Sequence, residues 1–215
     1  MRNLYQQQLE NLNRELIKMG AECEEIIGLA AAALTDYSAA LEEKTAQVGA
    51  LIDESERTIE NICLKLLLRQ QPVARDLRQI SAAMKMITDM ERIGDQAEDI
   101  VDLIPKMEKS AGDDSLVLKK MAQAAKNMVT EAVDAYVKQD LALARKVMAD
   151  DDIVDNFFLE MKSGIIGLIA KNPDEGEFAL DLLMISKYFE RIGDHCTNIA
   201  EWVVFSLTGI HEECQ

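Results

Sequence analysis

Hydrophobic side chains recur along this chain at intervals of three and four residues, which is the period of an amphipathic helix. The first stripe runs from Leu9 to Leu41 and predicts one helix of about 35 residues, roughly 50 Å long. A second stripe runs from Val48 to Leu66, and a third runs from Leu77 to Val101 after Pro72. No segment alternates with the β-branched and aromatic enrichment of strands. The pattern therefore predicts an all-α protein.

The chain also divides into two similar halves. The pentapeptide ERIGD begins at Glu91 and again at Glu190, an offset of 190 − 91 = 99 residues, and the same offset carries Val48 to Val147. Pro105 and the sequence SAGDDS that follows it end the third stripe. We therefore predict two tandem antiparallel three-helix bundles related by internal duplication, spanning residues 1–109 and 113–215.

Two further helix starts are predicted from capping residues. Asp140 is a plausible N-cap before the fifth helix. Asn172 is a plausible N-cap before the sixth, with Pro173 at the first helical position and acidic residues in the first turn.

Composition narrows the classes of protein that the chain can belong to. The longest apolar run, from Ile26 to Leu34, is nine residues, whereas a membrane-spanning helix needs about 20. The N-terminus is polar, which predicts no signal peptide, and the four cysteines are widely spaced, as in a reducing compartment. We expect a cytoplasmic protein without a transmembrane segment. The formal net charge of −16 argues against binding nucleic acid or anionic lipid.

The repeated pentapeptide places acids where the helix pattern calls for apolar side chains. The three-four spacing of the third and sixth stripes reaches Glu91 and Glu190, and Asp95 and Asp194 follow one helical turn later. Desolvating an unpaired carboxylate costs several kcal/mol, so a positive group must offset these charges. A glycine stands between the two acids of each copy, where a missing side chain lets another group approach closely.

Two kinds of positive group are available. Arg92 is spaced to pair with Asp89 or Asp95, and Arg191 to pair with Asp194, which would make each copy an internal salt-bridge cluster. The alternative is a metal ion, since hard cations take clustered carboxylate oxygens and a helical bundle brings several helices together. Neighbouring helices supply acid pairs one turn apart for such a site, and the spacing alone leaves both alternatives open.

The segments QPVARDLR, from Gln71 to Arg78, and ERIGD resemble the PhoU family of phosphate-signalling regulators, and the likeness covers essentially the whole chain. The resemblance implies two similar three-helix bundles whose acid-xxx-acid motifs hold metal ions, as iron or zinc clusters in some members. Carried over by position, these motifs fall on Glu56, Glu60, Glu91, Asp95, Asp151, Asp155, Glu190 and Asp194. The two sets are not strict copies, because the 99-residue offset pairs Glu60 with Leu159 and Asp151 with Ile52.

The resemblance also implies a function. Such proteins act as cytoplasmic adaptors between the ATPase subunit of a phosphate-specific ABC transporter and a sensor histidine kinase, and they restrain the phosphate-starvation response. They are not known as enzymes. The sequence agrees, because it has no GxxxxGK[ST] loop and no nucleophile with an evident base nearby.

A basic cluster surrounds Pro72 in this acidic chain. Arg69, Arg75 and Arg78 are candidates for a docking contact with a partner protein, since Arg75 and Arg78 stand in the first turns of a helix, where the dipole disfavours cations. The alternative is a solvated helix end with local pairing to Asp76.

Two other classes of protein fit the sequence less well. A di-metal carboxylate enzyme would use Glu-x-x-His motifs, but neither His195 nor His211 has a glutamate three residues before it. A purely structural helical scaffold explains the stripes but leaves the repeated acids without a role. We expect His195 to form a surface or interhelical hydrogen bond rather than bind metal. The apolar run from Trp202 to Phe205 predicts either a homodimer contact or a contact with the neighbouring bundle.

Overall fold

The computed structural model describes residues 2–70, 73–107 and 114–212, and side chains in the terminal turns 2–5, 69–70 and 114–115 are not described. Within these ranges the chain forms long α-helices and two short 3₁₀ turns, with no strand. The elements are α1 (Arg2–Ala33), α2 (Ala39–Gln70), α3 (Ala74–Leu103), η1 (Ile104–Lys106), α4 (Asp114–Lys138), α5 (Leu141–Lys171), η2 (Pro173–Glu175) and α6 (Gly176–Thr208). The all-α prediction is confirmed.

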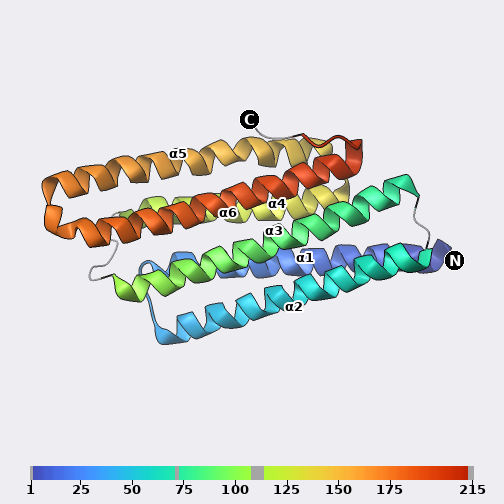
Figure 1. The fold of residues 1–215 in the computed structure, drawn as a ribbon, viewed down its shortest axis with the longest axis horizontal. Coiled ribbons are helices and arrows are strands. Elements are labelled where there is room, and N and C mark those ends of the chain that lie inside the picture. The colour runs from blue at the N-terminus through green and yellow to red at the C-terminus, as the bar shows by residue number, and fades with distance from the viewer. Residues whose placement is uncertain (1, 71–72, 108–113, 213–215) are drawn as a thin grey trace.

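The two halves lie side by side, with α1, α3, α4 and α6 in the middle (Figure 1). The outer helix α2 packs mainly on α1 and α3, and the other outer helix, α5, packs mainly on α4 and α6. The most extensive helix contact in the molecule joins α3 to α6, which are the two ERIGD helices from different halves. One apolar core therefore runs through both bundles. The predicted boundary between residues 109 and 113 lies outside the described residues.

The stripes of the sequence are the buried faces of these helices. Leu12, Leu16 and Met19 on α1 have no exposed surface, and neither do Ile59 and Leu66 on α2. Burial of such side chains stabilises a fold by about 1.5–3 kcal/mol each, which is why helices with a continuous stripe pack along their length. Among the described residues, no helix is both long enough and apolar enough to cross a membrane.

Two details of the first and third helices differ from the prediction. Helix α1 ends at Ala33, and Leu41 belongs to α2, so the stripe from Leu9 to Leu41 spans two helices and the turn between them. The three-four spacing continued by chance across that turn, where Ser38 accepts a hydrogen bond from the Leu41 amide at 3.2 Å and begins a new helix. Leu77 is 44% exposed and lies outside the core.

Of the two predicted N-caps, Asp140 and Asn172, the structure confirms the first and not the second. The Asp140 side chain accepts a hydrogen bond from the Leu143 amide at 3.0 Å, as an N-cap does. The Asn172 side chain makes no capping hydrogen bond, and Pro173 begins the 3₁₀ turn η2 before α6 starts at Gly176. The side chains of Cys23, Cys63 and Cys196 are buried free thiols.

Candidate functional site

The first ERIGD copy lies on α3 and faces the outer helix α2. Gly94 is buried there, and a Cβ on it would stand 3.1 Å from Ile52 Cδ1, so the glycine allows α2 to approach α3 closely. The group that approaches the glycine of this copy is thus the apolar side chain of Ile52. Glu91 is half-buried and Asp95 is exposed, one on each side of this contact.

A cavity of about 260 Å³ opens between α2 and α3 beside this contact. We call it the α2–α3 groove. Glu98 also enters it, and its carboxylate lies against Gly49 of α2, where a Cβ would be 1.9 Å from Oε1. Gly49 therefore provides the space that the Glu98 carboxylate occupies. The residues that line the groove are Ala46, Gly49, Ala50, Ile52, Asp53, Glu91, Gly94, Asp95 and Glu98.

The carboxyl groups in and around this groove disfavour one another's ionisation. Burial and the charges of Asp95 and Glu56 raise the pKa of Glu91, and Arg92 offsets them only in part. Burial followed by the nearest carboxylates also raises the pKa of Asp95 and Glu98. Such a cluster has a negative electrostatic potential. A bound cation would offset this potential, because a nearby positive charge favours the ionised form of each carboxyl group.

The predicted residues of the first half meet this groove to different extents. Glu91 and Asp95 line it, whereas Glu56 stands next to it, with a pKa raised by burial and by the charge of Glu60. Glu60 is exposed and does not line the groove. Sequence reasoning missed Asp53 and Glu98 as site residues. The signal for Glu98 was in the chain, because it continues the three-four spacing from Gly94 towards Val101.

The second ERIGD copy lies on α6 and faces the other outer helix, α5. A Cβ on Gly193 would be 3.1 Å from Asp151 Oδ1 and 3.3 Å from Val154 Cγ1, so here the close group is a carboxylate. Burial, followed by the charges of Asp155 and Asp194, raises the pKa of Asp151 to about 6. Asp151 Oδ1 is buried, and a side-chain hydrogen bond from Thr197 offsets part of the rise in its pKa.

The second cluster has its own basic residue. Lys187 Nζ forms an ion pair with Glu190, whose side chain is 13% exposed, and lies 5.5 Å from the centre of the Phe158 ring. The predicted pairing of Arg92 and Arg191 with the ERIGD aspartates is absent from the ion pairs of the described residues. The positive partner of Glu190 is therefore a lysine one turn earlier on the same helix.

The donors suit hard cations, since both clusters offer only oxygen atoms. In the part of the chain that the structure describes, however, no three His, Cys, Asp or Glu side chains are arranged so that they could hold an ion as they stand. Side-chain rotations on the outer helices would have to bring the carboxylates together. The eight predicted metal ligands therefore stay a prediction.

His195 does not belong to either cluster. Its Nδ1 lies 2.9 Å from Asp89 Oδ1 on α3, and Asn198 Nδ2 donates to the same oxygen at 3.1 Å. The predicted interhelical hydrogen bond is confirmed, and it joins the two halves. The 99-residue offset relates this contact to a second one, because Asp89 matches Tyr188 and Asn198 matches Asp99. Burial, the charge of Asp99 and a hydrogen bond to it raise the pKa of Tyr188. The α3–α6 contact is thus approximately two-fold symmetric.

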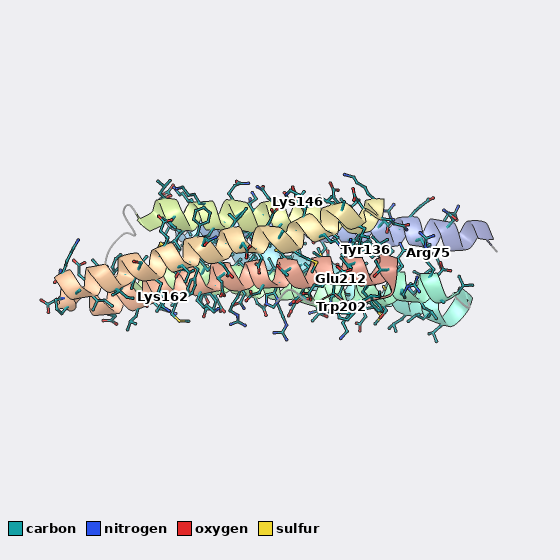
Figure 2. The ribbon with its side chains drawn as sticks, turned by 90° about the horizontal axis from the view of Figure 1, so that it is seen from above. Arg75, Tyr136, Lys146, Lys162, Trp202 and Glu212 are labelled. Atoms are coloured by element: carbon teal, nitrogen blue, oxygen red, sulfur yellow. The ribbon has the colours of Figure 1, made fainter. Side chains whose placement is uncertain are left out.

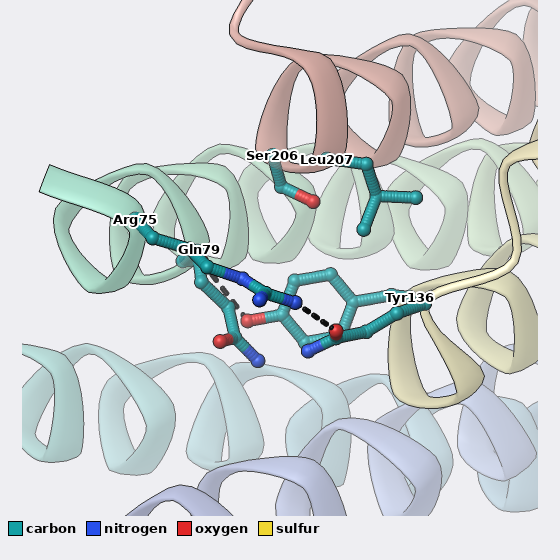
Figure 3. A pocket seen from close by; sticks show the side chains of 6 residues that line it. Arg75, Gln79, Tyr136, Ser206 and Leu207 are labelled. Carbon is teal, nitrogen blue, oxygen red and sulfur yellow. Dashed lines mark hydrogen bonds between the residues drawn. The ribbon is translucent and has the colours of Figure 1, made fainter.

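The arginines of QPVARDLR contact the other half of the chain. Arg75 donates to Gln139 Oε1 at 2.6 Å, and Tyr136 donates to the Gln79 carbonyl at 2.9 Å beside it (Figure 3). The cavity there is only about 10 Å³, enough for about one water molecule. Arg75 and Tyr136 lie towards one end of the molecule, far from Lys162 at the other (Figure 2).

Arg78 contacts the same region from the next turn. Its Nε and Cδ would be 3.6 Å from a Cβ at Gly209, which ends α6 with φ of 79°. Neither arginine pairs with Asp76 in the described ion pairs, and the Arg69 side chain lies outside the described residues. These contacts hold the ends of α3, α4 and α6 together, while docking by these arginines remains a prediction.

The C-terminal apolar run packs largely inside the molecule. Val203 and Val204 have no exposed surface. The Trp202 and His211 rings pack edge-on, with their centroids 4.6 Å apart. Lys85 of α3 lies 5.8 Å from the centre of the Trp202 ring. Of the two predicted roles, the structure shows a contact with the neighbouring bundle, and the homodimer stays a prediction.

A duplicated six-helix bundle with an acidic cluster between each outer helix and its ERIGD helix defines an all-helical, two-repeat class of protein. The PhoU domain family model matches residues 16–104 and 118–203 of this chain. The chain belongs to the PhoU family, as the motifs QPVARDLR and ERIGD indicated.

Individual relatives extend the likeness over nearly the whole chain. A phosphate-specific transport system accessory protein PhoU homolog of Clostridium acetobutylicum is 32% identical over 97% of this chain and 96% of its own length. The homolog of Pseudomonas aeruginosa is 31% identical over 94% of this chain and 84% of its own. The crystal structure of PhoU from Pseudomonas aeruginosa superposes with a TM-score of 0.89 at 29% identity, covering 96% of this chain and 100% of that one. PhoU from Streptococcus pneumoniae, with a TM-score of 0.87 at 23% identity over 97% and 99% of the two chains, shows the same fold.

Proposed function

We propose that this chain is a cytoplasmic, non-enzymatic regulator of phosphate uptake and of phosphate-starvation signalling. It acts as a metal-binding adaptor between the ATPase subunit of a phosphate ABC transporter and a sensor histidine kinase, and restrains the starvation response when phosphate is plentiful. Family membership supports the link to phosphate transport, because the relatives are accessory proteins of phosphate-specific transport systems.

One observation carries the metal-binding part of this proposal. At both ERIGD copies, carboxyl groups that are partly buried stand close enough to raise each other's pKa, and in the second copy Asp151 Oδ1 packs against Gly193. A bundle that served only as a scaffold would gain stability from apolar residues at these positions. A cation bound by the folded state alone stabilises it by RT ln(1 + [L]/Kd), about 2.7 kcal/mol at a hundredfold excess over Kd.

The metal content of the purified protein tests this part. Untagged wild type is compared with the double variant Glu91→Ala/Glu190→Ala by elemental analysis after equal purification. As a control, Glu54→Ala/Asp152→Ala removes two exposed acids from α2 and α5, the outer helices that face the same two clusters. We expect the ERIGD variant to lose most of the bound iron, zinc or other cation and the control to retain it. Equal metal content in wild type and the ERIGD variant would contradict the assignment.

The adaptor part has a separate test. Purified chain, metal-loaded or treated with chelator, is passed over the immobilised ATPase subunit of the phosphate transporter. We expect retention of the wild type and loss of retention on charge reversal of Arg75 and Arg78, with circular dichroism confirming that the variant is folded. Retention of that variant at the wild-type yield would exclude these arginines as the docking contact, and no retention of wild type would remove the transporter as partner.

A further inference from the structure

The chain turns back at the end of α6. Gly209 ends this helix with φ of 79°, and its amide donates to the Phe205 carbonyl at 2.8 Å. A left-handed φ favours glycine, so the reversal is encoded at this position. The four residues 209–212, which we call the strap, then run along the beginning of α5 (Figure 1).

Two side chains attach the strap. Arg145 of α5 donates to both carboxylate oxygens of Glu212, from Nε at 3.1 Å and from Nη2 at 2.6 Å. This hydrogen bonding lowers the pKa of Glu212. The His211 ring packs edge-on against the Trp202 ring, and its centroid is 6.4 Å from that of Phe205. The strap thus places a ring on an indole and a carboxylate on a guanidinium.

Basic side chains surround the strap. Arg145 reaches it from α5, whereas Arg78 and Lys85 lie on one face of α3, two turns apart. Side-chain atoms of Arg78 are 3.6 Å from the Cβ position of Gly209, and Lys85 Nζ is 5.8 Å from the centre of the Trp202 ring. Arg78 Nε is buried and has no hydrogen-bonding partner among the described residues. In a chain of net charge −16, three basic residues around one short segment form a local site for a negative group.

The contacts that hold the strap are weak ones. Residues 209–211 are exposed, and Ile210 contributes no side chain to the core. The side chains of Arg145 and Glu212 are 53% and 34% exposed, and ion pairs this open to water contribute little to stability. A ligand with the same two groups can therefore displace the strap.

The first repeat shows that the bundle does not need these anchors. The 99-residue offset pairs Arg145 with Ala46 and Trp202 with Leu103. The first repeat therefore forms its three packed helices with neither a guanidinium nor an indole at these positions. Release of the strap leaves the fold of the second repeat intact for the same reason.

We propose that the strap is an internal ligand, which occupies a site for an acidic peptide segment of a partner protein formed by Arg145, Trp202 and Lys85, and which that segment displaces. The strap itself shows the chemistry of the ligand, a ring followed by a carboxylate in His211 and Glu212. Because it is tethered, the strap has an effective concentration in the millimolar range, so it excludes weak acidic ligands and yields to tighter ones. The inference depends neither on metal binding nor on the transporter as partner.

Binding of a strap peptide in trans tests the site. The peptide IHEE, residues 210–213 with both terminal charges blocked, is titrated into the full chain and into a chain ending at Gly209, which keeps the residue that ends α6. Trp202 is the only tryptophan in the sequence, so its fluorescence reports binding. We expect the shortened chain to bind IHEE at least about fivefold more tightly than the full chain does, and neither to bind the uncharged peptide IHQQ.

Two variants of the shortened chain separate this site from other basic positions. Arg145→Ala should weaken IHEE binding by about tenfold or more, because it removes a charge-assisted pair of hydrogen bonds. Lys162→Ala removes another exposed basic residue of α5, far from Trp202 (Figure 2), and should leave binding unchanged. Unweakened binding by Arg145→Ala, equal binding of IHEE and IHQQ, or no binding of IHEE to the shortened chain would overturn the proposal.

Acrylamide quenching of Trp202 fluorescence in the full chain is a second measurement that needs no truncation. Glu212→Gln removes the charge that Arg145 binds, so it should raise the quenching constant as Arg145→Ala does. Glu160→Gln changes another exposed glutamate and should have no effect. Unchanged quenching in Glu212→Gln would overturn the proposal, because the strap would then be held by contacts that an acidic segment does not replace.

Discussion

Replacing Asp151 with asparagine should make the metal-free protein more stable at neutral pH. The folded structure raises the pKa of Asp151 to about 6, from about 4 in an unfolded chain. This difference corresponds to about 3 kcal/mol of penalty for the ionised form if the group were fully buried. Because Asp151 is only half buried, solvent screening reduces the expected penalty to about 1–2 kcal/mol. Asp151→Asn removes the charge and keeps the shape.

The sign of the pH dependence follows from proton binding. Between pH 4 and pH 6 the folded state holds the Asp151 proton more tightly than the unfolded chain does, so the free energy of unfolding falls as pH rises through this window. Below pH 4 the carboxyl is protonated in both states and the penalty vanishes. Above pH 6 the penalty is constant. At pH 5 we expect about half of the gain seen at pH 7.5.

Thermal unfolding in chelator, followed by circular dichroism at pH 5 and pH 7.5, measures this effect. For a chain of this size 1 kcal/mol shifts Tm by about 2–4 °C, so Asp151→Asn should raise Tm by about 2–8 °C at pH 7.5. Asp152→Asn is the matched control, because Asp152 is the adjacent aspartate and is exposed. Equal changes in Tm at the two pH values, or an equal rise in Tm for Asp152→Asn, would refute the assignment of the free-energy penalty to the burial of Asp151.

Three further predictions concern other contacts of the structure. Gly49→Ala should raise the free energy of unfolding in chelator by up to about 1 kcal/mol through helix propensity. It should also weaken Mn²⁺ binding, because the new Cβ displaces the flexible Glu98 carboxylate. An unchanged Mn²⁺ titration would contradict this prediction. Asp89→Ala leaves the half-buried His195 without its acceptor and should cost about 1–3 kcal/mol in urea denaturation, with Asp89→Asn costing less. Asp140→Ala removes the N-cap of α5 and should cost about 1 kcal/mol by the same measurement.

The helices and their buried faces could be read from the sequence because each depends on local spacing. Ile59 and Leu66 fall on one face of α2 whatever surrounds it, and both are fully buried. The duplication was equally visible, since equal spacing of ERIGD needs no coordinates. The exception was the end of α1, where the apolar spacing continued across a turn and concealed it.

The candidate site was predicted less completely, because it depends on how helices align along their axes. Glu91 and Asp95 were found from their own helix, but the approach of Glu98 to Gly49 depends on the axial register of α3 against α2. The pairing of Glu190 with Lys187 was also missed, although its spacing of three residues is local, because the arginines beside the motif offered an equal alternative.

The sequence by itself determined that this protein is helical, duplicated and marked by acids inside its apolar stripes, because periodicity and repetition are properties of the chain. Only the tertiary structure decided that α3 and α6 join the halves and that Asp151 packs against Gly193 beside the Thr197 hydroxyl. The physical reason is that side-chain packing between helices distant in sequence sets their relative position. No local spacing encodes which side chains come into contact when two such helices meet.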